Sequence, residues 1–191
     1  MRDKRLVDRI IAGDRKSGEL LVSEQYPRLF RLLRWLTDNR EAAEDLTQQT
    51  FVRAWSGLPN FRGDCTLSTW LHQIAYREYV RWLKEKREHI PLDTVEDMQS
   101  SEVDSTPDSL ALSAALDKLP RDLRDTFLLH YLQELNVAEV ARTLGVPEGT
   151  VKSRLYTARR RLRDLLQDSP SISQTPSAII NEVLTDELPA S

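Results

Sequence analysis

The sequence predicts an all-α protein made of two small helical domains joined by a flexible acidic linker, the second domain being a helix-turn-helix. Nearly every apolar run repeats with the period of an α-helix, and no convincing strand alternation occurs in the 191 residues. All four tryptophans fall within the first 90 residues, which indicates that an aromatic core lies there. The charges are also divided into blocks, and these blocks mark the expected boundaries.

Two basic blocks alternate with two acidic segments along the chain. Residues 1–90 carry a net charge of +4, and residues 116–167 carry +3. Residues 91–115 hold six acids and no base, and residues 168–191 hold four acids alone, so the whole chain totals −3. An acidic stretch rich in Ser and Thr and poor in aromatics is typical of a linker. The expected organisation is a first domain at 1–90, a linker at 91–109, a second domain at 110–167 and a tail at 168–191.

Four helices are expected in the first domain. The apolar spacing in "LVDRIIAGD" predicts the first, which Gly13 and Asp14 end, and "SGELLVSEQYPRLFRLLRWLTDN" predicts a second with a kink near Pro27. Asp38 and Asn39 offer a stop and then a cap for the helix "REAAEDLTQQTFVRAW". The loop "LPNFRGDCTLSTW", rich in Gly, Pro and hydroxyl side chains, leads into the fourth helix, "WLHQIAYREYVRWLKEKRE".

The second domain begins with helices in "LALSAALDKL" and "PRDLRDTFLLHYLQEL" and ends in a helix-turn-helix. Its two last helices are "VAEVARTLG" and "GVPEGTVKSRLYTARRRLRDLL". Gly145 falls at the turn, where a positive φ is easiest for glycine, and Ala141 is small where the helices must cross closely. Pro147 suits the first turn of the last helix, and Glu148 suits the positive end of its dipole.

The last helix has one apolar stripe and an opposite face of cations, hydroxyls and one aromatic. A major groove admits one α-helix, and the side chains near its N-terminus meet the base edges. Lys152, Ser153, Tyr156 and Thr157 occupy those outward positions. The arginines that follow are expected at the height of the phosphates, where cations add salt-dependent affinity; they are Arg159, Arg160, Arg161 and Arg163. The alternative is a solvated basic face on an ordinary helical bundle.

The helix after Trp70 interleaves cations with aromatics. Arg77, Arg81 and Lys84 lie within one narrow strip, which suits a phosphate backbone. Tyr76, Tyr79 and Trp82 lie between these charges, and aromatic rings can stack on unpaired bases of any sequence. The hydroxyls of "RGDCTLST" can line a pocket for an extruded base. The alternative places the aromatics in the core, as is expected for Trp82, with the cations merely solvated.

The third helix carries a polar face made of acids and amides. Asp45, Gln48 and Gln49 share one sector with Glu41 and Val52. From the residues alone, this face is either solvated or a site for a partner.

Together these segments resemble a bacterial RNA polymerase sigma factor of the extracytoplasmic function (ECF) group of the sigma-70 family. The resemblance covers roughly residues 3–90 and 108–167. It is carried by four segments in the family's order: "AAEDLTQQTFVRAW", "FRGDCTLSTWLHQIA", "LPRDLRDTFLLHYLQEL" and "EVARTLGVPEGTVKSRLYTARRRLRDLL". It implies a two-domain transcription-initiation subunit without catalytic activity, and an anti-sigma factor as a further partner.

The resemblance also implies three sites. Asp45, Gln48 and Gln49 are expected to dock on the clamp helices of core RNA polymerase. The −10 element, captured as a single strand, is expected to contact Arg62, Thr66, Ser68, Thr69, Tyr76, Arg77, Tyr79, Arg81 and Lys84. The −35 element, read as duplex, is expected to contact Gly149, Thr150, Lys152, Ser153, Tyr156, Thr157 and Arg160.

The chain departs from the family pattern at two positions of the fourth helix. After "IA" the family often has an Arg-Asn pair and then an Asp four residues beyond the Asn; here Arg77 and Arg81 stand at those two positions. An extra cation therefore replaces each, which is expected to change the preference for −10 sequences. In the tail, Ile179, Ile180, Val183, Leu184 and Leu188 fit either a disordered segment or a short acidic helix that docks on the second domain.

Two other functions remain open on the sequence: a stand-alone helix-turn-helix regulator, and a sigma-like decoy that captures an anti-sigma factor. An enzyme is not expected, because the three histidines stand far apart with no nucleophile or phosphate loop near them. A single cysteine, Cys65, supplies no disulfide, metal site or redox pair, so neither metal nor cofactor is expected. No leader or membrane-spanning segment is predicted, and a cytoplasmic location is expected.

Overall fold

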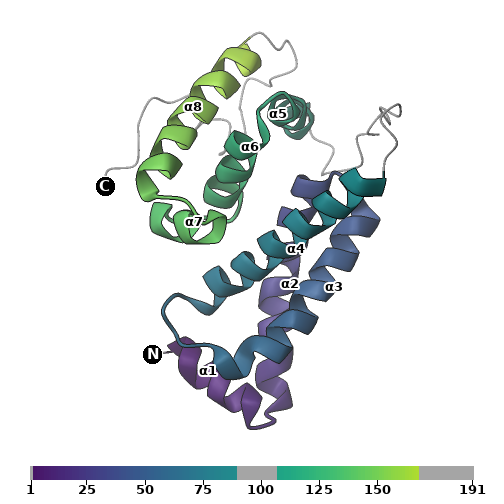
Figure 1. Ribbon diagram of the computed structural model, residues 1–191, viewed down its shortest axis with the longest axis vertical. Helices are drawn as coiled ribbons and strands as arrows, with labels where there is room; N and C mark the ends of the chain where they lie inside the picture. Colours follow the sequence, from purple (N-terminus) through teal and green to yellow (C-terminus); the bar gives the residue numbers. More distant parts are fainter. Residues whose placement is uncertain (1, 90–106, 168–191) are drawn as a thin grey trace. The chain divides into compact units, whose positions relative to one another are not determined.

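The computed structural model describes residues 2–89 and 107–167, and those residues form helices joined by short connections, with no strand among them (Figure 1). They divide into two compact units, with α1–α4 in the first and α5–α8 in the second. The predicted all-α fold class of two helical domains is therefore confirmed. The expected tail at 168–191 and most of the expected linker at 91–109 lie outside the described residues, since α5 already begins at Pro107.

The first unit is a bundle of three long helices with one shorter helix against it. Its elements are α1 (Arg2–Ile11), α2 (Arg15–Thr37), α3 (Arg40–Gly57), the 3-10 turn η1 (Leu58–Asn60) and α4 (Leu67–His89). Helices α2, α3 and α4 pack on one another, and α1 packs against α2 and η1 (Figure 1). The centre of the bundle holds fully buried aliphatic side chains from all three long helices: Leu29, Leu32, Leu33, Ala43, Ala54, Leu71 and Ala75.

The junction between α2 and α3 has the predicted stop and cap. Asp38 adopts the left-handed conformation with φ 50°, and its backbone N–H donates to Arg34 O. The side chain of Asn39 accepts a 2.8 Å hydrogen bond from the backbone N–H of Ala42 at the start of α3. Helix α2 itself continues through Pro27 as a single element. A short polar sequence thus reverses the chain between two helices that share the core.

The start of α4 is tied to the start of the chain. Thr66 Oγ1 accepts a hydrogen bond from the backbone N–H of Thr69, and Asp3 accepts a 2.7 Å bond from the backbone N–H of Leu67. These acceptors satisfy N–H groups that have no partner within the helix. A side chain at Gly57 would place its Cβ 3.1 Å from the ring of Trp70, so this glycine lets the end of α3 lie close to α4.

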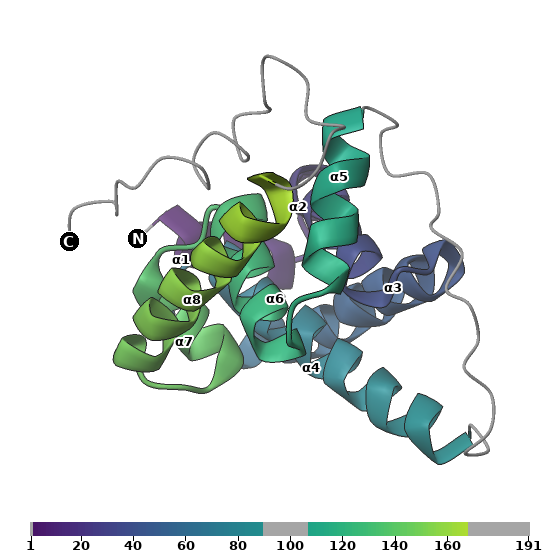
Figure 2. The ribbon, with the colours of Figure 1, turned by 90° about the horizontal axis from the view of Figure 1, so that it is seen from above.

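The described part of the second unit, residues 107–167, contains five helical elements. They are α5 (Pro107–Asp117), α6 (Arg121–Phe127), the π-helical turn η2 (Leu128–Leu132), α7 (Val137–Leu144) and α8 (Glu148–Gln167). Helices α5 and α6 both pack against α8, as seen from above in Figure 2. The buried side chains of this unit are again mainly aliphatic, with one phenylalanine among them: Leu116, Phe127, Leu129, Val140, Val151, Leu155, Leu162 and Leu166.

Helices α7 and α8 form the predicted helix-turn-helix. Asn136 and Glu139 make a reciprocal capping box at the start of α7, with both hydrogen bonds at 3.0 Å. Gly145 ends α7 with φ 69°, as predicted for a residue that must adopt the left-handed conformation. Ala141 is buried on α7, and α8 begins one residue after Pro147.

Candidate protein and nucleic-acid interfaces

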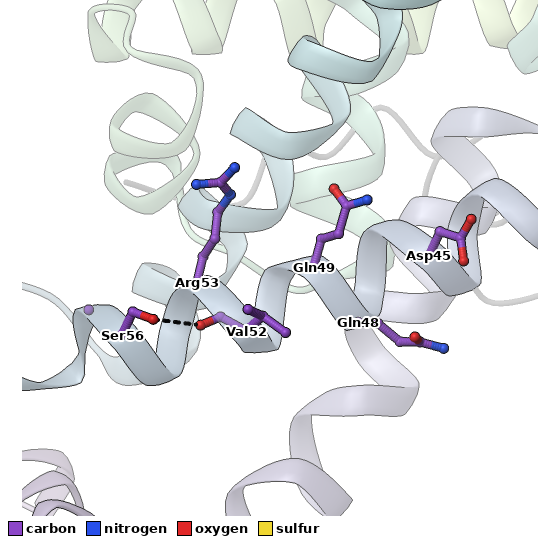
Figure 3. Close-up of a pocket in the computed structure, with 7 residues that line it drawn as sticks. Asp45, Gln48, Gln49, Val52, Arg53 and Ser56 are labelled. Atoms are coloured by element: carbon purple, nitrogen blue, oxygen red, sulfur yellow. Dashed lines mark hydrogen bonds between the residues drawn. The ribbon is translucent and has the colours of Figure 1, made fainter.

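The outward face of α3 forms a groove of about 860 Å³. Asp45, Gln48 and Gln49 are exposed and line it, so the structure brings together the three residues predicted to bind polymerase. In Figure 3, Gln49 and Arg53 project to one side of α3, whereas Gln48 projects to the other. The full lining is Asp45, Gln48, Gln49, Val52, Arg53, Ser56 and Gly57. The groove therefore offers a carboxylate, two amides and a guanidinium around an apolar centre.

Two apolar side chains on α3 are more exposed than their type predicts. Val52 is 67% exposed in the groove, and Trp55 is 43% exposed one turn further along the helix. Trp55 is therefore a tryptophan of the first unit that lies at the surface and not in the core. Val52 follows Gln48 by four residues and Trp55 follows Val52 by three, and this spacing was the signal in the sequence, because such residues are neighbours on a helix surface. An apolar centre with a polar rim is typical of a protein–protein interface.

The hydroxyls predicted to line a base pocket fall into two groups. Arg62 and Thr66 are exposed in the loop before α4, and Ser68 is half-buried. Thr69 is fully buried, and its Oγ1 lies 2.7 Å from Thr66 Oγ1 within the cap of α4. Thr69 was expected to contact single-stranded DNA. In the structure its hydroxyl is buried and hydrogen-bonded within the cap of α4, so it is not exposed for that contact.

The predicted cation strip on α4 is present. Arg77 and Lys84 are exposed, and the side chain of Arg81 is 46% exposed. The aromatic residues differ from the expectation: Tyr79 is 3% exposed, whereas Tyr76 and Trp82 are each partly exposed. The three rings form a ladder, with centroids 5.9 Å apart for Tyr76–Tyr79 and 6.3 Å apart for Tyr79–Trp82.

Helical spacing explains the burial of Tyr79. It follows Leu71 by eight residues and Ala75 by four, so it lies on the face that both residues turn toward the core. Tyr79 is therefore not available to stack on a base in this structure. Tyr76 and Trp82, at the two ends of the ladder, supply its accessible ring surface.

A buried acid on α4 was not among the predicted site residues. Glu78 is 2% exposed, and its carboxylate pairs with Arg53 Nε on α3 at 2.5 Å and with an Arg81 terminal nitrogen at 2.8 Å. The three-residue spacing of Glu78 and Arg81 was visible in the sequence. The pairing with Arg53 was not visible, because it joins two helices whose facing sides only the fold determines.

The face of α8 that is predicted to read duplex DNA is exposed to solvent, as the helical period predicts. Lys152, Ser153 and Arg160 are exposed, and Tyr156 is 58% exposed. Gly149 is exposed, and Thr150 and Thr157 are partly exposed. The structure thus places the seven predicted residues on the first four turns of one helix. Backbone N–H groups, hydroxyls and cations there can meet base edges and phosphates.

One arginine of α8 differs from the predicted exposure. Arg159 is 5% exposed, because it follows Leu155 by four residues and precedes Leu162 by three, and both leucines are buried. Arg163 is also partly buried, whereas Arg160 and Arg161 are exposed. Arg154 pairs with Asp122 of α6 at 3.3 Å. Fewer cations of α8 are therefore available to DNA phosphates than the number of arginines and lysines in its sequence.

Two further features are absent from residues 2–89 and 107–167. No group of three His, Cys, Asp or Glu side chains is arranged to hold a metal ion among the described residues. No described helix is long and apolar enough to span a membrane.

Comparison with known proteins identifies the family. Residues 21–89 match the family model of sigma-70 region 2, and residues 109–162 match that of sigma-70 region 4. These matches place the two units in the sigma-70 class of transcription-initiation proteins. The ECF RNA polymerase sigma factor SigM of Mycobacterium tuberculosis is 34% identical over 169 residues, which cover 86% of this chain and 84% of SigM.

A second relative gives the same assignment. The ECF RNA polymerase sigma-E factor of Haemophilus influenzae is 30% identical over 182 residues, which cover 86% of this chain and 95% of that protein. The chain therefore belongs to the ECF sigma factors, which confirms the resemblance seen in the sequence. This is a family of transcription regulators and not a family of catalytic enzymes.

Solved structures share the arrangement of helices. The sigma factor RpoE of Bartonella quintana, crystallised with the anti-sigma factor NepR, matches with a TM-score of 0.66 and 26% identity over 81% of this chain and 99% of RpoE. CnrH, in complex with the cytosolic domain of CnrY, matches with a TM-score of 0.65 over 87% of this chain and 99% of CnrH. At 23% identity, CnrH supports the fold alone.

Proposed function

We propose that this sigma factor directs core RNA polymerase to promoters by reading the −35 element as duplex and holding the −10 element as a single strand. The α3 groove docks on polymerase, α8 enters the major groove, and α4 with the loop before it takes the unpaired strand. The observation that carries the proposal is the outward face of α8, where Lys152, Ser153 and Tyr156 are exposed on the turns that follow Gly145.

The energetics support a division of labour with polymerase. Extruding a base costs a few kcal/mol, and stacking on an aromatic ring returns about 1–3 kcal/mol per base. With Tyr79 buried, the predicted strip of α4 offers the partly exposed rings of Tyr76 and Trp82. Strand capture then needs polymerase and the −35 contact to hold the protein in place. A nanomolar promoter complex formed at physiological salt without polymerase contradicts this mechanism.

The direct test is transcription from fragmented host genomic DNA. Core polymerase is used with and without the protein, and the 5′ ends of the RNA are sequenced. New start sites that share two upstream motifs are expected, and they define the promoter. No new start despite demonstrated binding to core polymerase rejects the proposal and favours a decoy that captures anti-sigma factors.

An anti-sigma factor is the further partner in this proposal. The Bartonella RpoE structure, to which the chain is similar over most of its length, contains such a factor. We expect that in its host this protein is bound by an anti-sigma factor, which core polymerase displaces. Because core polymerase is its other partner, we expect the protein to act in the cytoplasm. Purification of the tagged protein followed by addition of core polymerase tests this, because a bound protein that remains after polymerase binds is not an anti-sigma factor.

A further inference from the structure

One buried carboxylate connects the two proposed sites of the first unit. Glu78 is 2% exposed and pairs with two arginines, Arg53 at 2.5 Å and Arg81 at 2.8 Å. Arg53 lines the α3 groove proposed for polymerase, and Arg81 lies on the α4 strip proposed for the single strand. The side chains of both arginines are about half exposed, at 52% and 46%, so each reaches from the carboxylate to the surface.

The two arginines are not equivalent partners. Arg53 joins α3 to α4, whereas Arg81 is three residues from Glu78 on the same helix. Because Arg81 is on the same helix as Glu78 and its side chain is 46% exposed, it can turn toward another anion without any change in the packing of α3 on α4. A buried carboxylate must, however, keep one cation, because an unpaired buried charge is strongly unfavourable. Arg81 is therefore free to leave only while Arg53 stays.

We propose that Glu78 holds Arg81 in reserve, and that Arg53 is the anchor that lets Arg81 move to a phosphate of the unpaired strand. In the free protein the carboxylate neutralises Arg81 and lowers its affinity for nucleic acid. When a strand phosphate takes Arg81, Arg53 alone compensates Glu78. Glu78 and Arg53 are thus positioning residues that act through Arg81. This inference rests on the proposed strand site on α4.

The experiment measures binding of the full chain to a fluorescent oligothymidylate over a range of salt concentrations. Glu78→Gln keeps the shape of the side chain and removes the charge, so Arg81 is released and affinity is expected to rise about twofold to fivefold. The salt dependence is expected to stay the same, because Arg81 contacts the strand in the complex of either protein and the number of phosphate contacts does not change. Glu44→Gln, which removes the same charge from a pair with Arg40 on α3, is the matched control and is expected to leave the affinity unchanged.

Arg53→Ala is expected to behave like Arg81→Ala, although Arg53 lies on a different helix. Without Arg53, Arg81 is the only partner of Glu78 and is held there, so the slope falls by about 0.7 as if the strand contact were lost. The double variant of both arginines is expected to lose no further affinity. When Glu78 is already replaced by Gln, Arg53→Ala is expected to have no effect on strand binding. In the otherwise wild-type protein, Arg53→Lys keeps a cation beside Glu78 and is expected to bind the strand as well as the wild type does.

Two results separate this inference from the proposed function. If Arg77→Ala leaves strand binding unchanged, the strand site on α4 is wrong and the inference fails with it. If Arg77→Ala weakens binding but Glu78→Gln leaves the affinity unchanged, only the reserve role of Glu78 is overturned. Should Arg53→Ala fail to fold, the Glu78→Gln result alone decides, because that variant keeps the buried shape.

Discussion

Helices α4 and α8 both carry cations and aromatics outward, yet the two helices hold them in different ways. On α8 the residues proposed to read duplex DNA are exposed, and Tyr156 has more than half of its surface in solvent. On α4 Tyr79 is buried, Arg81 is paired to Glu78, and Thr69 is used in the cap of the helix. Duplex DNA presents its base edges in a fixed arrangement that a rigid, exposed helix face can contact. A single strand becomes available only after the two DNA strands have separated. The comparison therefore indicates that α8 is ready to bind and that α4 needs a second event.

The largest expected effect is loss of duplex binding from α8. Lys152→Ala combined with Arg160→Ala removes two exposed cations, and each charged contact is worth about a factor of ten in affinity. Affinity of the polymerase complex for promoter duplex is expected to fall on the order of a hundredfold. The salt slope is expected to fall by about 1.8, because each contact with B-DNA contributes about 0.9.

The control for this prediction uses the other helix. Arg77→Ala combined with Lys84→Ala is expected to leave binding to closed duplex unchanged and to weaken binding to a pre-opened −10 bubble. Lys118→Ala, an exposed cation outside both faces, is expected to change neither. Equal losses on duplex from α4 and α8 would remove the distinction between the two helices.

The next expected effect tests whether the α3 groove is a protein interface rather than a solvated face. Val52→Asp places a charge at the apolar centre of the groove, where Val52 is 67% exposed. Affinity for core polymerase is expected to fall by about tenfold or more, since truncating a central interface residue costs up to several kcal/mol. Fluorescence titration of labelled protein with core polymerase measures it.

Leu20→Asp is the matched control for the groove. Leu20 is also an exposed aliphatic residue, 50% exposed, but it lies on α2 and does not line the groove. Its replacement is expected to leave core affinity within twofold. A similar loss from both variants points to general misfolding of the first unit, and the melting temperature distinguishes that outcome.

A smaller effect concerns the turn that orients α8. Gly145→Ala forces a side chain into the left-handed region at φ 69°, and this costs about 1–2 kcal/mol even though no atom lies within 4 Å of the new Cβ. Urea denaturation is expected to show that loss of unfolding free energy. Gly149→Ala is the control, because a helical glycine with open space gains about 0.5–1 kcal/mol on substitution by alanine. A stability gain with weaker duplex binding indicates that DNA approaches the backbone at Gly149.

The smallest expected effect is a pH dependence at the start of α2. The hydrogen bond from Ser17 and the neighbouring Arg9 hold the pKa of Asp14 below its usual value of 3.8. A carboxylate with a lowered pKa stabilises the fold above that usual value, and the contribution disappears as the pH falls through the folded-state pKa. The melting temperature of Asp14→Asn is expected to be lower than that of the wild type at neutral pH, and the two melting temperatures are expected to converge in acid. A constant difference across this range contradicts the assignment.

Local rules in the sequence were sufficient for the elements and for α8. The stop at Asp38, the cap at Asn39 and the positive φ at Gly145 depend on a few neighbouring residues, so they were predictable. The outward face of α8 follows from the helical period once one stripe is known to be buried. The α3 face, with Val52 in the same sector as its polar residues, could also be located in this way.

What only the tertiary structure decided is which side of each helix meets a neighbour. Trp55 and Tyr79 have similar chemistry in the sequence, but one is exposed on α3 and the other is buried on α4. The pairing of Glu78 with Arg53 joins residues on two helices whose facing sides are set by the packing of the whole bundle. The period of a helix gives the direction of each side chain, but the partner in that direction comes from long-range packing. The sequence by itself therefore determined the helices and the family, and the fold determined which charges and rings are free to bind.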